Sequence, residues 1–175
     1  MNLHPLIVHF PIGLPATYSV LEYIRFKKVR TQSYWFYVKA ILVILGTVAA
    51  YTAIFFGSLI ENMFIAIPAK SAIVPVHEIW AIVTTVIFSF LAICYFIRWI
   101  HLDSNDATPL HSRPLLKKIW GILCLVSKHT IDTNVSFIFA AMGLASIAVT
   151  GALGGAIVYG TAFDPFITFV YRLFF

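Results

Sequence analysis

Long apolar runs separated by short polar segments make up most of the chain. Four of them carry few charges and have about twenty residues or more, at roughly 5–24, 35–56, 76–97 and 135–159. As helices rising about 1.5 Å per residue, each is long enough to cross the ~30 Å hydrocarbon core of a bilayer. The pattern predicts an all-α fold: one domain, 1–175, forming an integral membrane four-helix bundle.

Two shorter segments are predicted to lie along the membrane surface. Residues 115–128 (LLKKIWGILCLVSK) are too few and too basic to span easily, which is typical of an interfacial helix. The tail 165–175 follows Asp164 and opens with Pro165, the usual order of a side-chain cap and a first helical residue. Its aromatic residues suit an outer interface or a partner surface.

The composition agrees with a membrane protein and argues against nucleic-acid binding. Hydrophobic residues make up 61% of the chain and charged residues 11%, whereas soluble domains are about a quarter charged. The net charge of +5 comes from basic residues in the loops, not from a basic stripe along one element. No cleavable signal is expected, because no Lys or Arg precedes the first apolar run.

The positions of the basic residues predict the orientation. Ten of the 12 flank the same two connections, and cytoplasmic loops are the ones enriched in Lys and Arg. We therefore expect a multi-pass protein of the bacterial inner membrane with both termini in the periplasm. The two groups are Arg25, Lys27, Lys28, Arg30 and Lys39, and Arg98, Arg113, Lys117, Lys118 and Lys128.

Small residues recur at helical spacing in the second and fourth runs, which are predicted to form a tightly packed scaffold. In lipid, helices associate by close approach at such residues. The two predicted stripes are Gly46, Ala50, Ala53 and Gly57, and Ala141, Ala145, Ala148, Ala152 and Gly155.

Three of the six histidines are predicted at the outer leaflet. His4 and His9 begin the first run and His77 begins the third, so His9 and His77 have matching depth on different helices. Ionisable residues inside membranes usually face the bundle and mark function. The other three, His101, His111 and His129, fall near inner polar segments, where solvated side chains are expected.

His9 and His77 form the predicted ligand pair. His4 and His9 are five residues apart and point about 140° away from one another on a regular helix, so they do not easily share a ligand. Gly13 follows His9 and Ala81 follows His77 on the same faces, and such small residues leave room for a planar group. Interfacial imidazoles that only bind water or carbonyls are the alternative.

Prolines and acidic residues refine this picture. Pro11 and Pro15 lack the amide that continues the helix, which predicts a kink near His9 and a shaped edge of a binding site. Prolines tolerated by neighbouring helices are the alternative. Glu78 is expected to cap the third helix or to orient an imidazole. Glu22, three residues before Arg25, is expected to form a surface ion pair.

The opening HPLIVHFPI (residues 4–12) resembles a family of small bacterial integral membrane proteins catalogued as a domain of unknown function. The resemblance extends to His77 and to the closing GGAIVY, residues 154–159. It implies a four-helix bundle similar to small b-type cytochromes. Members often continue with Arg-His-Gly, where this chain has Gly160, Thr161 and Ala162, so a fourth histidine is absent.

These observations favour a haem b protein for electron transfer, with His9 and His77 as axial ligands of the iron and with His4, Gly13 and Ala81 beside the cofactor. A cofactor-free accessory subunit of a larger respiratory or photosynthetic complex is the first alternative. A non-haem copper, zinc or iron site using His4, His9, His77 and Glu78 is the second. No catalysis is predicted, and the expected partners are lipid, other membrane subunits or a periplasmic redox protein.

Overall fold

Every regular element in the described part of the chain is a helix. The computed structural model describes residues 9–24, 29, 32–68, 70–103 and 114–175. The helices in these ranges are α2 (His9–Tyr23), α4 (Ser33–Ser58), α5 (Glu61–Ile65), α6 (Ile73–Asp103), α7 (Pro114–Asp132), α8 (Val135–Tyr159) and α9 (Pro165–Phe174). This confirms the all-α prediction.

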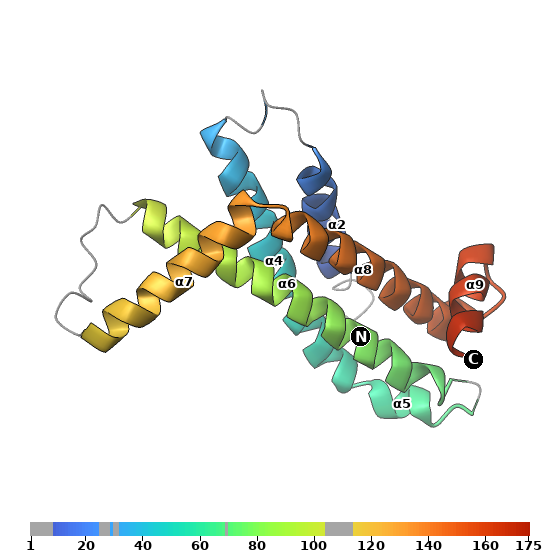
Figure 1. Cartoon of the computed structure of the whole chain (residues 1–175). Helices are drawn as coiled ribbons and strands as arrows, with labels where there is room; N and C mark the ends of the chain where they lie inside the picture. Colours follow the sequence, from blue (N-terminus) through green and yellow to red (C-terminus); the bar gives the residue numbers. More distant parts are fainter. Residues whose placement is uncertain (1–8, 25–28, 30–31, 69, 104–113) are drawn as a thin grey trace.

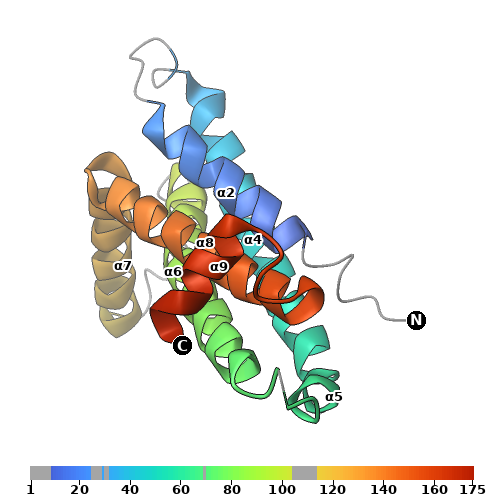
Figure 2. The same cartoon turned by 90° about the vertical axis from the view of Figure 1, so that its right-hand side faces the viewer.

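Four of these helices, α2, α4, α6 and α8, form the body of the molecule (Figures 1 and 2). α2 packs against α4 and α8, and α6 packs against the same two helices; α6 and α8 share the most extensive contact. Three of them, α4, α6 and α8, are long and apolar enough to cross a membrane. The chain is therefore a helical membrane protein.

The helix bounds differ from the predicted segments mainly in α6 and α7. α6 has 31 residues and extends beyond both ends of the predicted 76–97 span. α7 begins one residue before the predicted interfacial helix and continues four residues past it, to Asp132. It crosses the later part of α6 rather than running alongside it (Figure 1). The five-residue α5, between α4 and α6, was not predicted.

The predicted small-residue stripe lies on the packing face of α4 but only partly on that of α8, and each of these helices packs mainly on α2 and α6 rather than on the other. Gly46 of α4 is buried, and a Cβ there would lie 2.6 Å from Cγ of Pro15, so α2 and α4 approach closely at this point. On α8, Ala145 and Ala148 are exposed. The packing face of α8 is shifted by about one residue from the predicted stripe. Its buried residues include Ser136, Ala140, Gly143, Ser146 and Ile147.

An aromatic cluster fills the centre of the four helices. Tyr18 of α2 meets Phe88 and Tyr95 of α6 edge-on, with ring centroids 6.4 and 5.7 Å apart. The Phe88 ring lies over Gly143 of α8, where a Cβ would come within 2.5 Å of its Cζ. All three aromatic side chains are essentially inaccessible to solvent. This cluster separates the two polar regions described next.

Candidate functional site

His77 lies in the second turn of α6 and faces α8. Its Nδ1 is 3.0 Å from the backbone carbonyl oxygen of Thr150, 73 residues away in the chain. Gly154 is one turn further along α8, and a Cβ on that residue would be 3.2 Å from the imidazole Cε1. A glycine at 154 therefore lets the ring lie directly against the α8 backbone.

This contact determines which ring nitrogen is suited to coordination. A carbonyl oxygen only accepts hydrogen bonds, so Nδ1 is the protonated nitrogen and, in the neutral ring, Nε2 carries the lone pair. Metal-ligating histidines are commonly held this way, with the second nitrogen donating to a carbonyl. The orientation of His77 thus fits a ligand of haem iron.

A group of hydroxyls lies next to His77, in the contact between α6 and α8. Oγ1 of Thr84 contacts Oγ of Ser146 and lies 3.2 Å from Oγ1 of Thr150. Thr84 and Thr150 also donate to carbonyls one turn earlier in their own helices. Each hydroxyl is thereby satisfied within protein, as the bilayer core requires. Thr84 is buried, like Phe88 and Tyr95 further along α6, so this face of α6 points into the helical body.

The remaining predicted site residues have different surroundings. His9 and Gly13 are exposed, and Val20, on the same face of α2, is 53% exposed. At about 100° per residue, His9 and Tyr18 point to opposite sides of this helix. Ala81 is partly buried on α6. His4 lies outside the described residues, and the pairing of His9 with His77 stays a prediction.

Pro15 has a packing role. It is fully buried against Gly46, and α2 continues as a helix from His9 through both Pro11 and Pro15 to Tyr23. This supports the alternative that neighbouring helices accommodate the prolines. Any bend before His9 falls outside the described residues.

Other candidate ligands are dispersed. Glu78 is exposed, as are His101 and His129, whereas His111 lies outside the described ranges. Within those ranges, no group of three or more His, Cys, Asp or Glu side chains is placed to hold a metal ion. Cys124 on α7 has a raised thiol pKa because it is partly desolvated, with Arg98 opposing the shift, so it is protonated at neutral pH.

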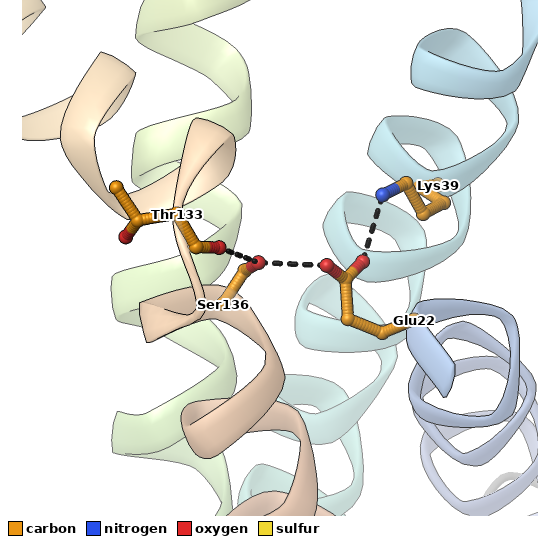
Figure 3. A network of polar contacts seen from close by, with 4 residues as sticks. All are labelled: Glu22, Lys39, Thr133 and Ser136. Carbon is orange, nitrogen blue, oxygen red and sulfur yellow. Dashed lines mark hydrogen bonds and ion pairs between the residues drawn. The ribbon is translucent and has the colours of Figure 1, made fainter. Parts of the chain in front are cut away.

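Glu22 corrects the expected surface ion pair. Its side chain is only 8% exposed, and Oε2 lies 2.7 Å from Nζ of Lys39 on α4. Oε1 accepts a hydrogen bond of 2.7 Å from Oγ of Ser136, at the start of α8. Figure 3 shows the carboxylate between these two partners, with Thr133 beyond Ser136. The carboxylate therefore joins three helices.

Sequence reasoning missed this network because its members are far apart in the chain. Glu22 is 17 residues from Lys39 and 114 from Ser136. One signal was available: Lys39 is a lone charge within the apolar run 35–56, and a charge in such a run requires a partner. The nearby Arg25 was a simpler candidate by distance along the chain.

Comparison with known proteins adds no relative to this description. No family model, no curated protein and no solved structure matches the chain. The resemblance carried by residues 4–12 stays a prediction.

Proposed function

We propose that this chain is a haem b-binding electron-transfer protein of the bacterial inner membrane. The observation that supports the proposal most strongly is the hydrogen bond of His77 Nδ1 to the Thr150 carbonyl, which prepares Nε2 for coordination. In this proposal the first apolar run is a fourth span, and both termini are periplasmic, as the distribution of Lys and Arg predicts.

Haem b would supply one-electron chemistry, because its iron alternates between the ferric and ferrous states. His77 would hold it as an axial ligand and His9 would be the second, with His4, Gly13 and Ala81 beside the porphyrin. Thr150 fixes the tautomer and orientation of His77. Hydrogen bonding to a ligand imidazole raises its basicity, so the Thr150 carbonyl would help set the reduction potential.

Absorption spectra of purified protein test the haem proposal. We expect a Soret band and a sharp reduced α band, both lost in His77→Ala. Gly154→Ala should weaken haem retention, because its Cβ would displace the imidazole by a few tenths of an ångström. Gly151→Ala is the matched control, since a Cβ there meets open space. Equal haem content in wild type and His77→Ala would refute His77 as a ligand.

The exposed aromatic face of α9 favours a second candidate, a cofactor-free accessory subunit. α9 packs on α8 through Ile167 and Val170, and its Asp164 cap accepts a 2.9 Å hydrogen bond from the Ile167 amide. Phe166 and Phe169 on the other side are more than half exposed. This reading predicts a colourless protein that purifies stoichiometrically with a larger membrane complex.

The non-haem metal reading predicts yet another outcome. A colourless preparation that contains copper, zinc or iron by elemental analysis, and loses it in His77→Ala, would replace the haem proposal with a non-haem metal site that includes His77.

A further inference from the structure

Outside its contact with the rest of the molecule, α7 exposes two different surfaces. Ser127 and Thr130 are its buried residues and mark the side that is held against the helical body. At about 100° per residue, four exposed aliphatic side chains lie within about 60° of one another and form an apolar stripe. They are Leu115, Ile119, Ile122 and Val126. In a membrane protein such a stripe is suited to contact with acyl chains.

A basic face runs beside this stripe. Lys117 and Lys128 are 11 residues apart in the sequence, which places them about 20° from one another and about 16 Å apart along the helix axis. Lys118 and His129 follow them by one residue each and widen the face towards the apolar stripe. All four side chains are exposed. The helix therefore presents basic side chains at both ends of one surface.

Neighbouring acidic groups do not neutralise this face. Asp132 is the one acidic residue of α7, and its carboxylate lies 3.8 Å from the guanidinium of Arg98 on α6. Among the described residues, none of the three lysines of α7 forms an ion pair. A partner that complements this surface is therefore anionic.

The apolar stripe and the direction of α7 identify this partner as lipid. α6 is long and apolar enough to span the membrane, and α7 crosses it rather than running alongside it (Figure 1). α7 is thereby turned towards the membrane plane, where its stripe can contact acyl chains and its lysines can contact headgroups. A soluble acidic protein or a nucleic acid would match the basic face alone and leave the stripe uncovered.

We propose that α7 is a binding surface for anionic phospholipids. The ammonium groups of Lys117 and Lys118 donate hydrogen bonds to the phosphate of one headgroup, and Lys128 and His129 donate to a second. Two headgroups are required, because about 16 Å along the helix separates the two ends of the basic face. The proposal is independent of haem binding, since none of these residues is assigned to the cofactor.

Quenching of a fluorophore on α7 tests the proposal locally. The full-length protein carries Cys94→Ala, Cys124→Ala and Gly121→Cys, with bimane attached at position 121, where a Cβ meets open space. Nanodiscs of phosphatidylcholine contain the same small fraction of nitroxide-labelled phosphatidylglycerol or nitroxide-labelled phosphatidylcholine. We expect severalfold stronger quenching by the labelled phosphatidylglycerol, because each Lys near an anionic lipid surface contributes about fivefold to binding.

Removal of charge provides the decisive comparison. Lys117→Gln with Lys128→Gln should lower the preference for phosphatidylglycerol severalfold, and Lys117→Arg with Lys128→Arg should retain it. Lys70→Gln with Arg172→Gln is the matched control, because it removes two basic side chains outside α7 and should leave the preference unchanged. Salt at about 1 M should also abolish the preference, since the Debye length is then about 3 Å.

Equal quenching by the two labelled lipids at low salt, or an unchanged preference in Lys117→Gln with Lys128→Gln, would overturn the proposal. The basic face would then fit a soluble acidic partner rather than lipid. Both lysines are exposed, so the glutamine variants should keep the melting temperature of the parent protein in detergent. The salt measurement needs no substitution of the lysines, so it tests the proposal even if a variant were unstable.

Discussion

Among single side chains, Glu22 and Lys39 have the most demanding environment. Both side chains are at least 87% buried, and each would be a strongly unfavourable isolated charge. Their 2.7 Å contact, together with the hydrogen bond from Ser136, offsets the loss of hydration. Such pairs add little net stability when intact, but leave an uncompensated charge when one partner is removed. The pair therefore requires α2, α4 and α8 to assemble in one arrangement.

Lys39→Met should destabilise the protein by about 3 kcal/mol, because it leaves the Glu22 carboxylate buried and unpaired. Adding Glu22→Gln should restore a large part of this loss, since a neutral amide needs no counter-ion. Unfolding in a denaturing detergent or urea measures both effects. Lys117→Met on the exposed face of α7 is the control and should change the free energy of unfolding by less than 0.5 kcal/mol, as is usual for surface sites. A Lys39→Met variant as stable as wild type would contradict a required ion pair.

For whole helices, α6 and α8 fit tightly where the Phe88 ring of α6 lies over Gly143 of α8. Phe88 is 1% exposed and also contacts Tyr18, so its ring has little room to move aside. One turn before Phe88 in α6, the hydroxyl of Thr84 contacts that of Ser146 and joins the same two helices. Packing and polar contacts thus fix the register of α6 against α8.

Gly143→Ala should destabilise the protein by about 1–3 kcal/mol, because the new Cβ overlaps the Phe88 ring. Gly151→Ala on the same helix meets no atom within 4 Å and should be neutral or stabilising by up to about 1 kcal/mol, the difference in helix propensity. Melting temperatures of the two variants provide the comparison. If both substitutions had the same effect, the close contact at Gly143 would be refuted.

α7 has the surface of an interfacial helix. It is held to α6 at its C-terminal end, where Ser127 Oγ donates a 2.5 Å hydrogen bond to the Cys94 carbonyl and Arg98 lies 3.8 Å from Asp132. Elsewhere α7 exposes both apolar side chains, such as Ile122, and basic side chains, Lys117 and Lys118. A helix with both properties is suited to the boundary between headgroups and acyl chains.

Spin labels on α7 should report two environments. With Cys94 and Cys124 replaced, a nitroxide at Ile122 should collide mainly with oxygen in the bilayer, and one at Lys117, about 140° round the helix, mainly with a water-soluble nickel complex. Power-saturation EPR in liposomes measures both accessibilities. Equal exposure of the two positions to the nickel complex would show that α7 does not rest on the membrane.

Prediction from sequence succeeded for some small residues and failed for others. Gly46 was assigned correctly to the α4 packing face, because it recurs at helical spacing with Ala50 and Ala53, which are buried as well. The alanine stripe of α8 was assigned to packing although Ala145 and Ala148 face outward, since alanine is tolerated in both places. The partners of Glu22 and His77 are set by helix assembly, so periodicity within one helix does not reveal them.

For the whole molecule, the arrangement of α4, α6 and α8 fits a bilayer, and the basic residues predict which side each loop faces. The proposed topology, with four spans, places both ends of the chain in the periplasm. A C-terminal alkaline phosphatase fusion should then be active and a C-terminal green fluorescent protein fusion dark. The reverse result would mean an odd number of crossings or the opposite orientation.

The optical spectrum of the purified protein decides most directly whether this membrane protein carries haem. We expect one haem b, identified by its pyridine haemochrome, with bands that disappear in His77→Ala and persist in His101→Ala, where an exposed histidine at the end of α6 is removed. A colourless protein after expression with ample haem, or a spectrum unchanged in His77→Ala, would contradict the assignment.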